Sequence, residues 1–295
     1  MSSVTVLRSG SKTVEIGADR PFCIIGERIN PTGRKKFAEE LRGGDLSTVT
    51  HDAVAQVEAG ANMLDVNAGI PLVDEAELLV QMLQRTQATV EVPICIDSSV
   101  VEALEAGLSV YEGRALVNSV TAEDDRLEVV LPLVAKYDAA VIGLTNDETG
   151  IPATAEERLV HARKIVSAAQ DYGIEPCDVV IDPLAMPVGA DVEMALATFA
   201  AMRMIRDELG VNMCCGASNV SFGLPDRATL NAAFLPVAMS VGLTSAIMST
   251  AEVCVRSARA ADLLLGHDAW GANWIAAHRA RLAATEAAAS EVAAS

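Results

Sequence analysis

Residues 139–184 read AAVIGLTNDETGIPATAEERLVHARKIVSAAQDYGIEPCDVVIDPL. Two short apolar runs, 139–145 and 178–184, flank a longer segment, 153–173, whose apolar residues recur at helical spacing and which ends at a glycine. A buried strand, a crossover helix and a second buried strand follow one another in this order in a parallel sheet. The stretch therefore predicts a strand–helix–strand unit.

The same alternation continues along the whole chain. Helical segments such as 49–60 and 191–210 separate eight apolar runs, which occupy 21–27, 62–69, 92–99, 114–120, 139–145, 178–184, 212–219 and 245–250. An open doubly wound sheet usually carries a glycine-rich phosphate turn after its first strand, whereas residues 27–37 read ERINPTGRKKF. We therefore expect an α/β fold of the (β/α)8 TIM-barrel class.

The length fits one such barrel with short additions at both ends. A TIM barrel needs roughly 250 residues, and this chain has 295. We expect a single domain in which residues 21–278 form the barrel. Residues 1–20 are then an N-terminal extension, and the Ala-rich residues 279–295 are a C-terminal tail.

Charge and composition exclude several classes of partner. The formal net charge of −18 repels phosphate backbones, so we expect no nucleic acid. No apolar run reaches the ~20 residues of a membrane span, and the first residues lack the apolar segment of a secretory signal. These features predict a cytoplasmic protein that does not enter a membrane. The six cysteines lack the paired spacings of zinc sites, so we expect no metal.

Polar residues stand at the carboxyl ends of seven of the eight runs. In a closed parallel barrel these ends meet at one rim, where barrel enzymes place their chemistry. Asp, Asn and Ser also cap helices, and this alternative stays open for any single position. The residues are Glu27, Asp65, Asn67, Asp97, Ser98, Asn118, Ser119, Thr145, Asn146, Asp182 and Asn219.

The chemistry of this rim favours a flat ligand that carries both hydrogen-bond donors and acceptors. A phosphate would call for basic residues, and a sugar would favour aromatic side chains, which make up only 3% of the chain. A pterin fits, because its aminopyrimidinone edge presents paired N–H donors to a carboxylate and leaves acceptors for Asn and Ser. Apolar side chains, including Phe222, could form the slot for its ring.

Seven strings, taken together, resemble the pterin-binding methyltransferases from about residue 22 to about residue 265. That family includes the methyltetrahydrofolate:corrinoid iron–sulfur protein methyltransferase, the folate-binding module of cobalamin-dependent methionine synthase, and the methyltransferase components of corrinoid demethylase systems. The strings are GERINPTGRK (26–35), LDVNAG (64–69), CIDSS (95–99), VNSV (117–120), IGLTNDETGIP (142–152), IDPL (181–184) and GASNVSFGLPDR (216–227).

The resemblance implies a set of folate-binding residues. Asp97, Asn118 and Asp182 match the side chains that hold the pterin in the family, and Glu27 belongs to the same site. Where the acetogenic enzymes have a glutamine, this chain has Phe222, which puts that hydrogen bond in doubt. The predicted binding set is completed by Asp65, Ser98, Asn219, Arg227 and Phe222, with Arg227 as the cation near the folate.

The resemblance also implies a reaction, methyl transfer between methyltetrahydrofolate and the cobalamin of a separate corrinoid protein. A neutral tertiary amine is a poor leaving group, so the methylated ring nitrogen must gain positive charge by the transition state. The resemblance places Asn219 near that nitrogen. Our hypothesis is that Asn219 stabilises the protonated nitrogen while Asp182 and Asp97 hold the pterin, which makes Asn219 and Asp182 the predicted catalytic residues.

The partners follow from the same comparison. The sequence lacks an Asp-x-His-x-x-Gly string of the kind associated with cobalamin domains, so we expect the corrinoid on a partner protein. The direction stays open, because within a demethylation pathway the same site would methylate tetrahydrofolate. The resemblance implies a homodimer.

Two alternatives remain at this point. One is an enzyme like dihydropteroate synthase, which must bind pyrophosphate; the last run ends in MSTAE (248–252), without that family's basic residues. The other is a protein that binds folate without turnover, against which the intact Asn219 argues.

Overall fold

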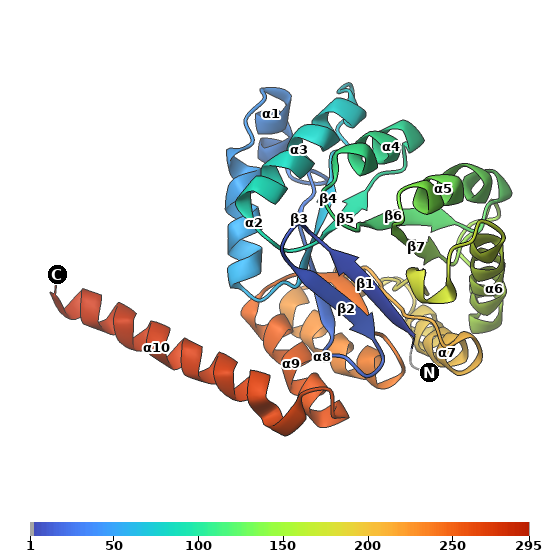
Figure 1. Ribbon diagram of the computed structural model, residues 1–295. Coiled ribbons are helices and arrows are strands. Elements are labelled where there is room, and N and C mark those ends of the chain that lie inside the picture. The colour runs from blue at the N-terminus through green and yellow to red at the C-terminus, as the bar shows by residue number, and fades with distance from the viewer. Residues whose placement is uncertain (1–2, 295) are drawn as a thin grey trace.

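The computed structural model describes the backbone of residues 3–294 and side chains up to residue 283. The chain forms a (β/α)8-type barrel in which parallel strands are surrounded by helices (Figure 1). Seven strands pair in the order β8-β7-β6-β5-β4-β3-β9, and each neighbouring pair is parallel. Their bounds are β3 Cys23–Ile29, β4 Met63–Asn67, β5 Ile94–Asp97, β6 Leu116–Thr121, β7 Ala140–Leu144, β8 Val179–Asp182 and β9 Ser245–Met248.

The seventh predicted run, 212–219, is not a regular strand, and here the expectation was wrong. It forms isolated parallel bridges, from Met213 to Ile181 on β8 and from Gly216 to Ile247 on β9. Immediately after Gly216 the chain enters the 3-10 helix η2 (Ala217–Ser221), so the segment is too short for a continuous ladder. Its backbone nevertheless joins the two edge strands and closes the barrel.

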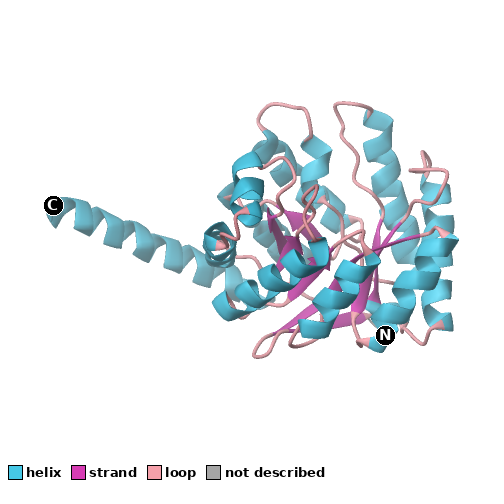
Figure 2. Cartoon of the chain, turned by 90° about the horizontal axis from the view of Figure 1, so that it is seen from above, coloured by secondary structure: helices cyan, strands magenta, loops and turns pink. Residues whose placement is uncertain are grey.

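The helices occupy the outside of the barrel, as Figure 2 shows from above. The predicted helical segments 49–60, 153–173 and 191–210 are α2, α6 and α7, and α7 ends at Gly210, whose φ of 62° is easily adopted by glycine. The helices are α1 Lys35–Arg42, α2 Ser47–Glu58, α3 Glu75–Thr89, α4 Val101–Val110, α5 Asp124–Lys136, α6 Ala155–Asp171, α7 Val192–Leu209, α8 Arg227–Ser240, α9 Glu252–Leu265 and α10 Ala272–Ala294.

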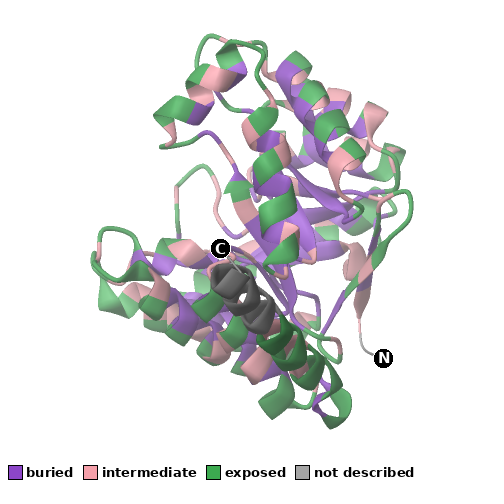
Figure 3. Cartoon of the chain, turned by 90° about the vertical axis from the view of Figure 1, so that its left-hand side faces the viewer, coloured by how far each residue is buried: buried purple, intermediate pink, exposed green. Residues whose placement is uncertain are grey.

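Two apolar cores hold the fold together. The larger one lies between the strands and the surrounding helices, and the strands are buried throughout most of their length (Figure 3). The smaller one fills the barrel interior with inward-facing residues from successive strands, in the manner of small closed barrels. Its buried members are Leu7, Ile16, Cys23, Ile25, Met63, Cys95, Leu116, Ala140, Ile142, Val180 and Cys214.

An N-terminal hairpin covers the amino-terminal end of the strands. Its strands are β1 (Val4–Arg8) and β2 (Thr13–Gly17), paired antiparallel within the region expected as an extension. Leu7 and Ile16 insert into the interior core, and Asn212 fixes the hairpin from the barrel side. The Asn212 Nδ2 group donates to Ser3 O, Thr5 Oγ1 and Ile16 O at 3.1, 3.0 and 2.9 Å.

The C-terminal helix α10 projects away from the barrel (Figures 1 and 2). It follows the short 3-10 helix η3 (Ala269–Gly271), and the expected Ala-rich tail, 279–295, begins inside it. Residue 295 lies outside the described part of the chain. Within residues 3–294, none of the helices has the length and hydropathy needed to cross a membrane.

Replacing Asn212 tests the attachment of the hairpin. We expect Asn212→Ala to lower the free energy of unfolding by about 2–4 kcal/mol, because three hydrogen bonds are lost and buried acceptors remain unpaired. Urea denaturation followed by circular dichroism measures the change. The matched control is Asn219→Ala at an exposed position, which should alter stability by less than ~0.5 kcal/mol. Equal stability of the two variants would contradict the role of Asn212.

Candidate active site

The strand register aligns the predicted polar residues at the carboxyl rim. Asn67 on β4 lies opposite Asp97 on β5, and Asp97 lies opposite Asn118 on β6. On the other side of the rim, Leu144 on β7 pairs with Asp182 on β8. Regular pairing within β4–β6 and within β7–β8 therefore aligns side chains from distant parts of the sequence, while the β6–β7 pair has a register shift after Asn118.

Two amide–carboxylate contacts connect the first three of these strands. Asn67 Nδ2 donates to Asp97 Oδ2 at 3.0 Å, and Asn118 Nδ2 donates to Asp65 Oδ1 at 3.1 Å. The hydroxyl of Ser98 is directed to the Glu75 carboxylate, and its backbone N–H donates to Asn118 O at 3.0 Å. Ser98 thus hydrogen-bonds to Glu75 and to the backbone of Asn118, and its buried side chain is already paired within the protein.

Burial changes the protonation of the two aspartates in this group. Desolvation, together with the charge of Asp97, raises the pKa of Asp65 well above its ordinary value. Desolvation also raises the pKa of Asp97 to about 6, although the hydrogen bond from Asn67 acts against this shift. Of the two acids, Asp65 therefore holds a proton more firmly than Asp97 does.

Asp182 is a separate acid on the far side of the rim. Its side chain is 9% exposed, and burial raises its pKa to about 7. Three features favour the ionised form: the backbone N–H of Leu184, which donates to Oδ1 at 2.7 Å, the backbone N–H of Gly216, and the nearby charge of Arg158. The balance leaves Asp182 close to half-ionised at neutral pH.

Glu27 joins the rim to the loop that follows the closing segment. Ser218 Oγ donates to Glu27 Oε1 at 2.9 Å, and Arg227 Nη2 donates to Ser218 O at 2.8 Å. Burial raises the pKa of Glu27, while Ser218 and the charges of Arg227 and Arg28 oppose the rise. Arg227 therefore orders the loop through Ser218 and sits near the acid, with its own side chain open to solvent.

The structure places Asn219 and Phe222 on the exposed side of this loop. The Asn219 amide folds back over Gly216, where Nδ2 would lie 2.8 Å from a Cβ atom, so any side chain at 216 would displace it. Phe222 is 66% exposed, with the Arg227 guanidinium 5.9 Å from its ring centre. Its ring therefore lines the mouth of the site and does not form part of a buried slot.

Two residues that the sequence analysis did not select belong to this arrangement. Ser218 holds Glu27, and its signal was only its place beside Asn219 in the SNVS string. Arg158 lies completely buried behind Asp182. A signal for Arg158 exists, because it stands in register with the apolar positions Ala162 and Ile165 on the inward stripe of α6, where a solvated charge is not expected.

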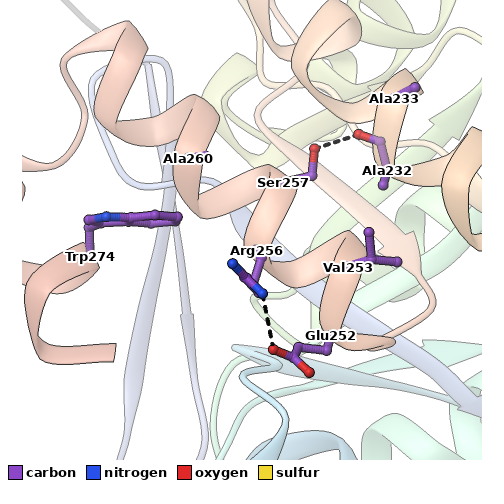
Figure 4. Close-up of a pocket in the computed structure, with 8 residues that line it drawn as sticks. All are labelled: Ala232, Ala233, Glu252, Val253, Arg256, Ser257, Ala260 and Trp274. Carbon is purple, nitrogen blue, oxygen red and sulfur yellow. Dashed lines mark hydrogen bonds and ion pairs between the residues drawn. The ribbon is translucent and has the colours of Figure 1, made fainter. Parts of the chain in front are cut away.

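Cavities lie both at the rim and away from it. One, of about 440 Å³, opens beside Glu27 and is also lined by Arg28, His51 and Thr250. A larger groove of about 660 Å³ lies between α8, α9 and the root of α10 and includes Trp274 and the Arg256–Glu252 ion pair (Figure 4). None of the predicted rim residues lines this larger groove.

The six cysteines are free, and five of them are buried; Cys177 is half-buried. Over the described residues, no cluster of three or more His, Cys, Asp or Glu side chains is arranged to hold a metal ion.

A parallel barrel with buried acids and amides at its carboxyl rim belongs to the class of TIM-barrel proteins, which place their binding sites at this end of the strands. The chain belongs to the family described as pterin binding enzymes, whose model matches residues 26–249.

Two named proteins are similar to this chain over about four fifths of its length. A methylcorrinoid:tetrahydrofolate methyltransferase of Eubacterium limosum is 35% identical over 252 residues, which cover 83% of this chain and 92% of that protein. The methionine synthase of Mycobacterium tuberculosis is 30% identical over 253 residues, but these cover 81% of this chain and only 21% of that much longer protein. The present chain thus corresponds to nearly all of the first protein and to one part of the second.

Similar solved structures confirm the barrel fold. A dihydropteroate synthase from Xanthomonas albilineans in complex with 7,8-dihydropteroate superposes with a TM-score of 0.69 and 20% identity, covering 88% of this chain and 98% of that chain. The enzyme from Vibrio fischeri ES114 gives 0.68 and 16%, with 89% and 98% covered. At these identities the likeness concerns the fold alone.

Asp182→Asn tests the buried acid through stability. A carboxyl group whose pKa rises to about 7 on folding stabilises the native state in its protonated form, and this contribution is lost as pH increases from about 4 to 7. The asparagine variant cannot ionise and keeps the Leu184 hydrogen bond. We expect its stability relative to wild type to increase by about 2–3 kcal/mol between pH 5 and pH 8.

The measurement is urea unfolding at several pH values. Asp171→Asn, at an exposed position at the end of α6, is the matched control and should follow the wild-type pH dependence. A difference between Asp182→Asn and wild type that stays constant with pH would show that Asp182 is not a buried acid of raised pKa.

Proposed function

We propose that this protein transfers a methyl group between a tetrahydrofolate and a corrinoid carried by a separate protein. The observation that carries the proposal is the set of buried acids and amides at the carboxyl rim, in a chain 35% identical to a methylcorrinoid:tetrahydrofolate methyltransferase. That relative's name joins the two methyl carriers, and the chain covers 92% of it.

In this proposal the pterin lies across the rim with its donor edge toward Asp182. An ionised Asp182 has Oδ1 engaged by Leu184 and still has lone pairs for the N–H groups of an aminopyrimidinone. On the opposite side, Asp97 and Asn118 supply acceptors and a donor, held in place by Asn67 and Asp65. In this arrangement, one end of the flat ring meets the carboxyl group of Asp182, and the other end meets the carboxyl group of Asp97 and the amide of Asn118.

Asn219 is proposed to act on the methylated ring nitrogen. Its amide lies over Gly216, beside the backbone N–H that bonds to Asp182, so Asn219 and Asp182 belong to one side of the site. A carboxamide oxygen can accept a hydrogen bond from a protonated ring nitrogen and stabilise the positive charge that departure of the methyl group requires. Glu27 and Ser218 would hold the loop that carries Asn219.

The corrinoid partner is proposed to dock over the same rim. When bound, the corrinoid supplies the cobalt centre that accepts or donates the methyl group. Exposed apolar side chains surround the mouth of the barrel, as expected of a surface that another protein covers. They are Leu72 after β4, Ile151 after β7 and Phe222 after η2, with 106%, 49% and 66% of their areas exposed.

The finer parts of the proposal follow from the named relatives. We propose tetrahydrofolate as the methyl acceptor, within a demethylation pathway, since the Eubacterium limosum relative is named for a methylcorrinoid and tetrahydrofolate. A cytoplasmic location and a homodimer complete the proposal. Pyrophosphate chemistry of the dihydropteroate synthase kind has no such support, because residues 248–252 at the end of β9 bring no basic side chain.

Asn219→Ala tests the reaction. The assay follows conversion of chemically reduced cobalamin to methylcobalamin by its absorbance, without oxygen, with methyltetrahydrofolate as donor. We expect turnover to fall about 10- to 150-fold, which corresponds to a charged hydrogen bond of ~1.5–3 kcal/mol. Affinity for tetrahydrofolate, measured by calorimetry, should change less than ~3-fold, because the amide contacts the nitrogen mainly in the transition state.

Asn273→Ala, an exposed asparagine at the start of α10, is the matched control and should behave as wild type. Unchanged turnover in Asn219→Ala would refute the role of Asn219. Absence of methyl transfer by the wild-type protein, with free cobalamin and with a corrinoid protein alike, would refute the methyltransferase proposal, even if tetrahydrofolate binds.

A further inference from the structure

Arg158 is a fully buried cation whose hydrogen-bond partners are all neutral. Its side chain has 0% exposure and lies in the first turn of α6. Nε donates to Pro152 O at 3.2 Å, and Nη1 donates to Pro183 O, Leu184 O and Thr198 Oγ1 at 2.8, 3.0 and 2.8 Å. Nη2 has no hydrogen-bond partner within the described part of the protein.

Two of the three carbonyl groups that Arg158 holds, those of Pro183 and Leu184, belong to the turn that follows Asp182. Leu184 has a φ of +62°, a left-handed conformation that costs a non-glycine residue roughly 1 kcal/mol. This conformation directs the Leu184 N–H to Asp182 Oδ1 at 2.7 Å. Thr198 assists from α7, since its hydroxyl contacts both Arg158 and Leu184 O. The guanidinium thus stabilises the turn that orients the acid.

The charge of Arg158 also acts on Asp182. No carboxylate among the described residues forms a direct ion pair with Arg158, and Asp182 is the acid whose charge it feels most. Burial lowers the pKa of the guanidinium, but a guanidinium is so strong a base that it stays charged. Through a low-dielectric interior such a charge favours the carboxylate form of its neighbour.

Other groups that face Asp182 carry no compensating charge. The closing segment contributes the Gly216 N–H and the thiols of Cys214 and Cys215, whose pKa values are raised by burial and by Asp182 itself, so both thiols are neutral. Directly after β7, the Thr145 hydroxyl donates to the backbone oxygen of Asp182 at 3.0 Å. Arg158 is therefore the nearby cation whose charge favours the ionised form of Asp182.

We propose that Arg158 is a positioning residue, which favours the carboxylate form of Asp182 and fixes the 182–184 turn so that this side chain faces the pterin. This inference rests on the proposed function in that the ligand is a pterin, but it does not require methyl transfer. Without the guanidinium, Asp182 becomes a neutral acid at pH 7 and loses the paired acceptors that a pterin edge needs.

The experiment measures the dissociation constant of tetrahydrofolate by anaerobic calorimetry between pH 6 and pH 9. For the wild type we expect weaker binding as the pH falls below about 7, where Asp182 takes up a proton. The variants are Arg158→Met and Arg158→Gln, which remove the charge, and Arg158→Lys, which keeps the charge but cannot bridge the same acceptors. Arg163→Met, on the exposed face of the same helix, is the matched control.

In the neutral variants the midpoint of the binding profile should move upward by about one pH unit, with ~5-fold weaker binding at pH 7. In Arg158→Lys the midpoint should stay near that of wild type, while affinity falls at least ~3-fold at every pH because the turn loosens. Arg158→Gln can keep one carbonyl contact and serves if Arg158→Met does not fold. The control should reproduce the wild-type profile.

If both neutral variants keep the wild-type midpoint, Arg158 does not favour ionisation of Asp182, and the electrostatic part of the proposal is overturned. If Arg158→Lys keeps the wild-type affinity, Arg158 does not stabilise the 182–184 turn, and that part is overturned. If the wild type binds tetrahydrofolate but transfers no methyl group, the proposed function fails while the profile still decides the role of Arg158. If the wild type binds no tetrahydrofolate, the proposed function fails, and so does the part of this proposal that names a pterin as the ligand. Carboxyl ¹³C NMR of Asp182 then shows whether Arg158 sets its ionisation.

Discussion

The structure depends on the closure of a parallel sheet around an apolar interior, which places several carboxyl groups in a region of low dielectric. The residues below the rim, such as Cys95, Ile142 and Val180, exclude water from the barrel. An acid above this layer cannot remain charged without hydrogen bonds or a nearby cation. The rim therefore contains acids of different strength: burial raises the pKa of Asp65 well above its ordinary value, that of Asp97 to about 6 and that of Asp182 to about 7.

This division gives the rim both hydrogen-bond donors and acceptors from acids and amides. The amides of Asn67 and Asn118 each satisfy one acid and fix its orientation. A set of fully ionised carboxylates would repel one another and bind cations. A set of fully neutral acids would lack strong acceptors. The observed mixture suits a heterocycle with both N–H and carbonyl groups on its edge, which is also the chemistry of the family to which the chain belongs.

Much of the fold could be predicted because the local pattern and the global topology agree. Six of the eight apolar runs become continuous strands with polar residues at or near their carboxyl ends, and β9 (Ser245–Met248) follows from the eighth. The rim residues were predictable for the same reason, since parallel pairing leaves them no other place to meet. The closing segment was harder, because Gly216 and the η2 turn interrupt a run whose composition resembles a strand.

Other features were not predictable, because they arise from contacts between distant segments. Arg158 reaches carbonyl groups about 25 residues away, and Ser218 reaches Glu27 across 191 residues. The raised pKa values require the burial that only the finished barrel provides. Phe222 was expected to help form an apolar slot, but the loop after η2 turns its ring toward solvent, where the contact with Arg227 holds it.

The N-terminal hairpin has a consequence for the order of folding. The hairpin precedes the barrel strands in the chain, yet the amide that anchors it, on Asn212, lies up to 209 positions later. The hairpin alone has too few strands and too little apolar surface to be stable in water. The hairpin can therefore attach to the amino-terminal end of the barrel only after residues 212–219 have been synthesised. Until then, Leu7 and Ile16 lack part of the interior core against which they pack, so docking of the hairpin is a late step in folding.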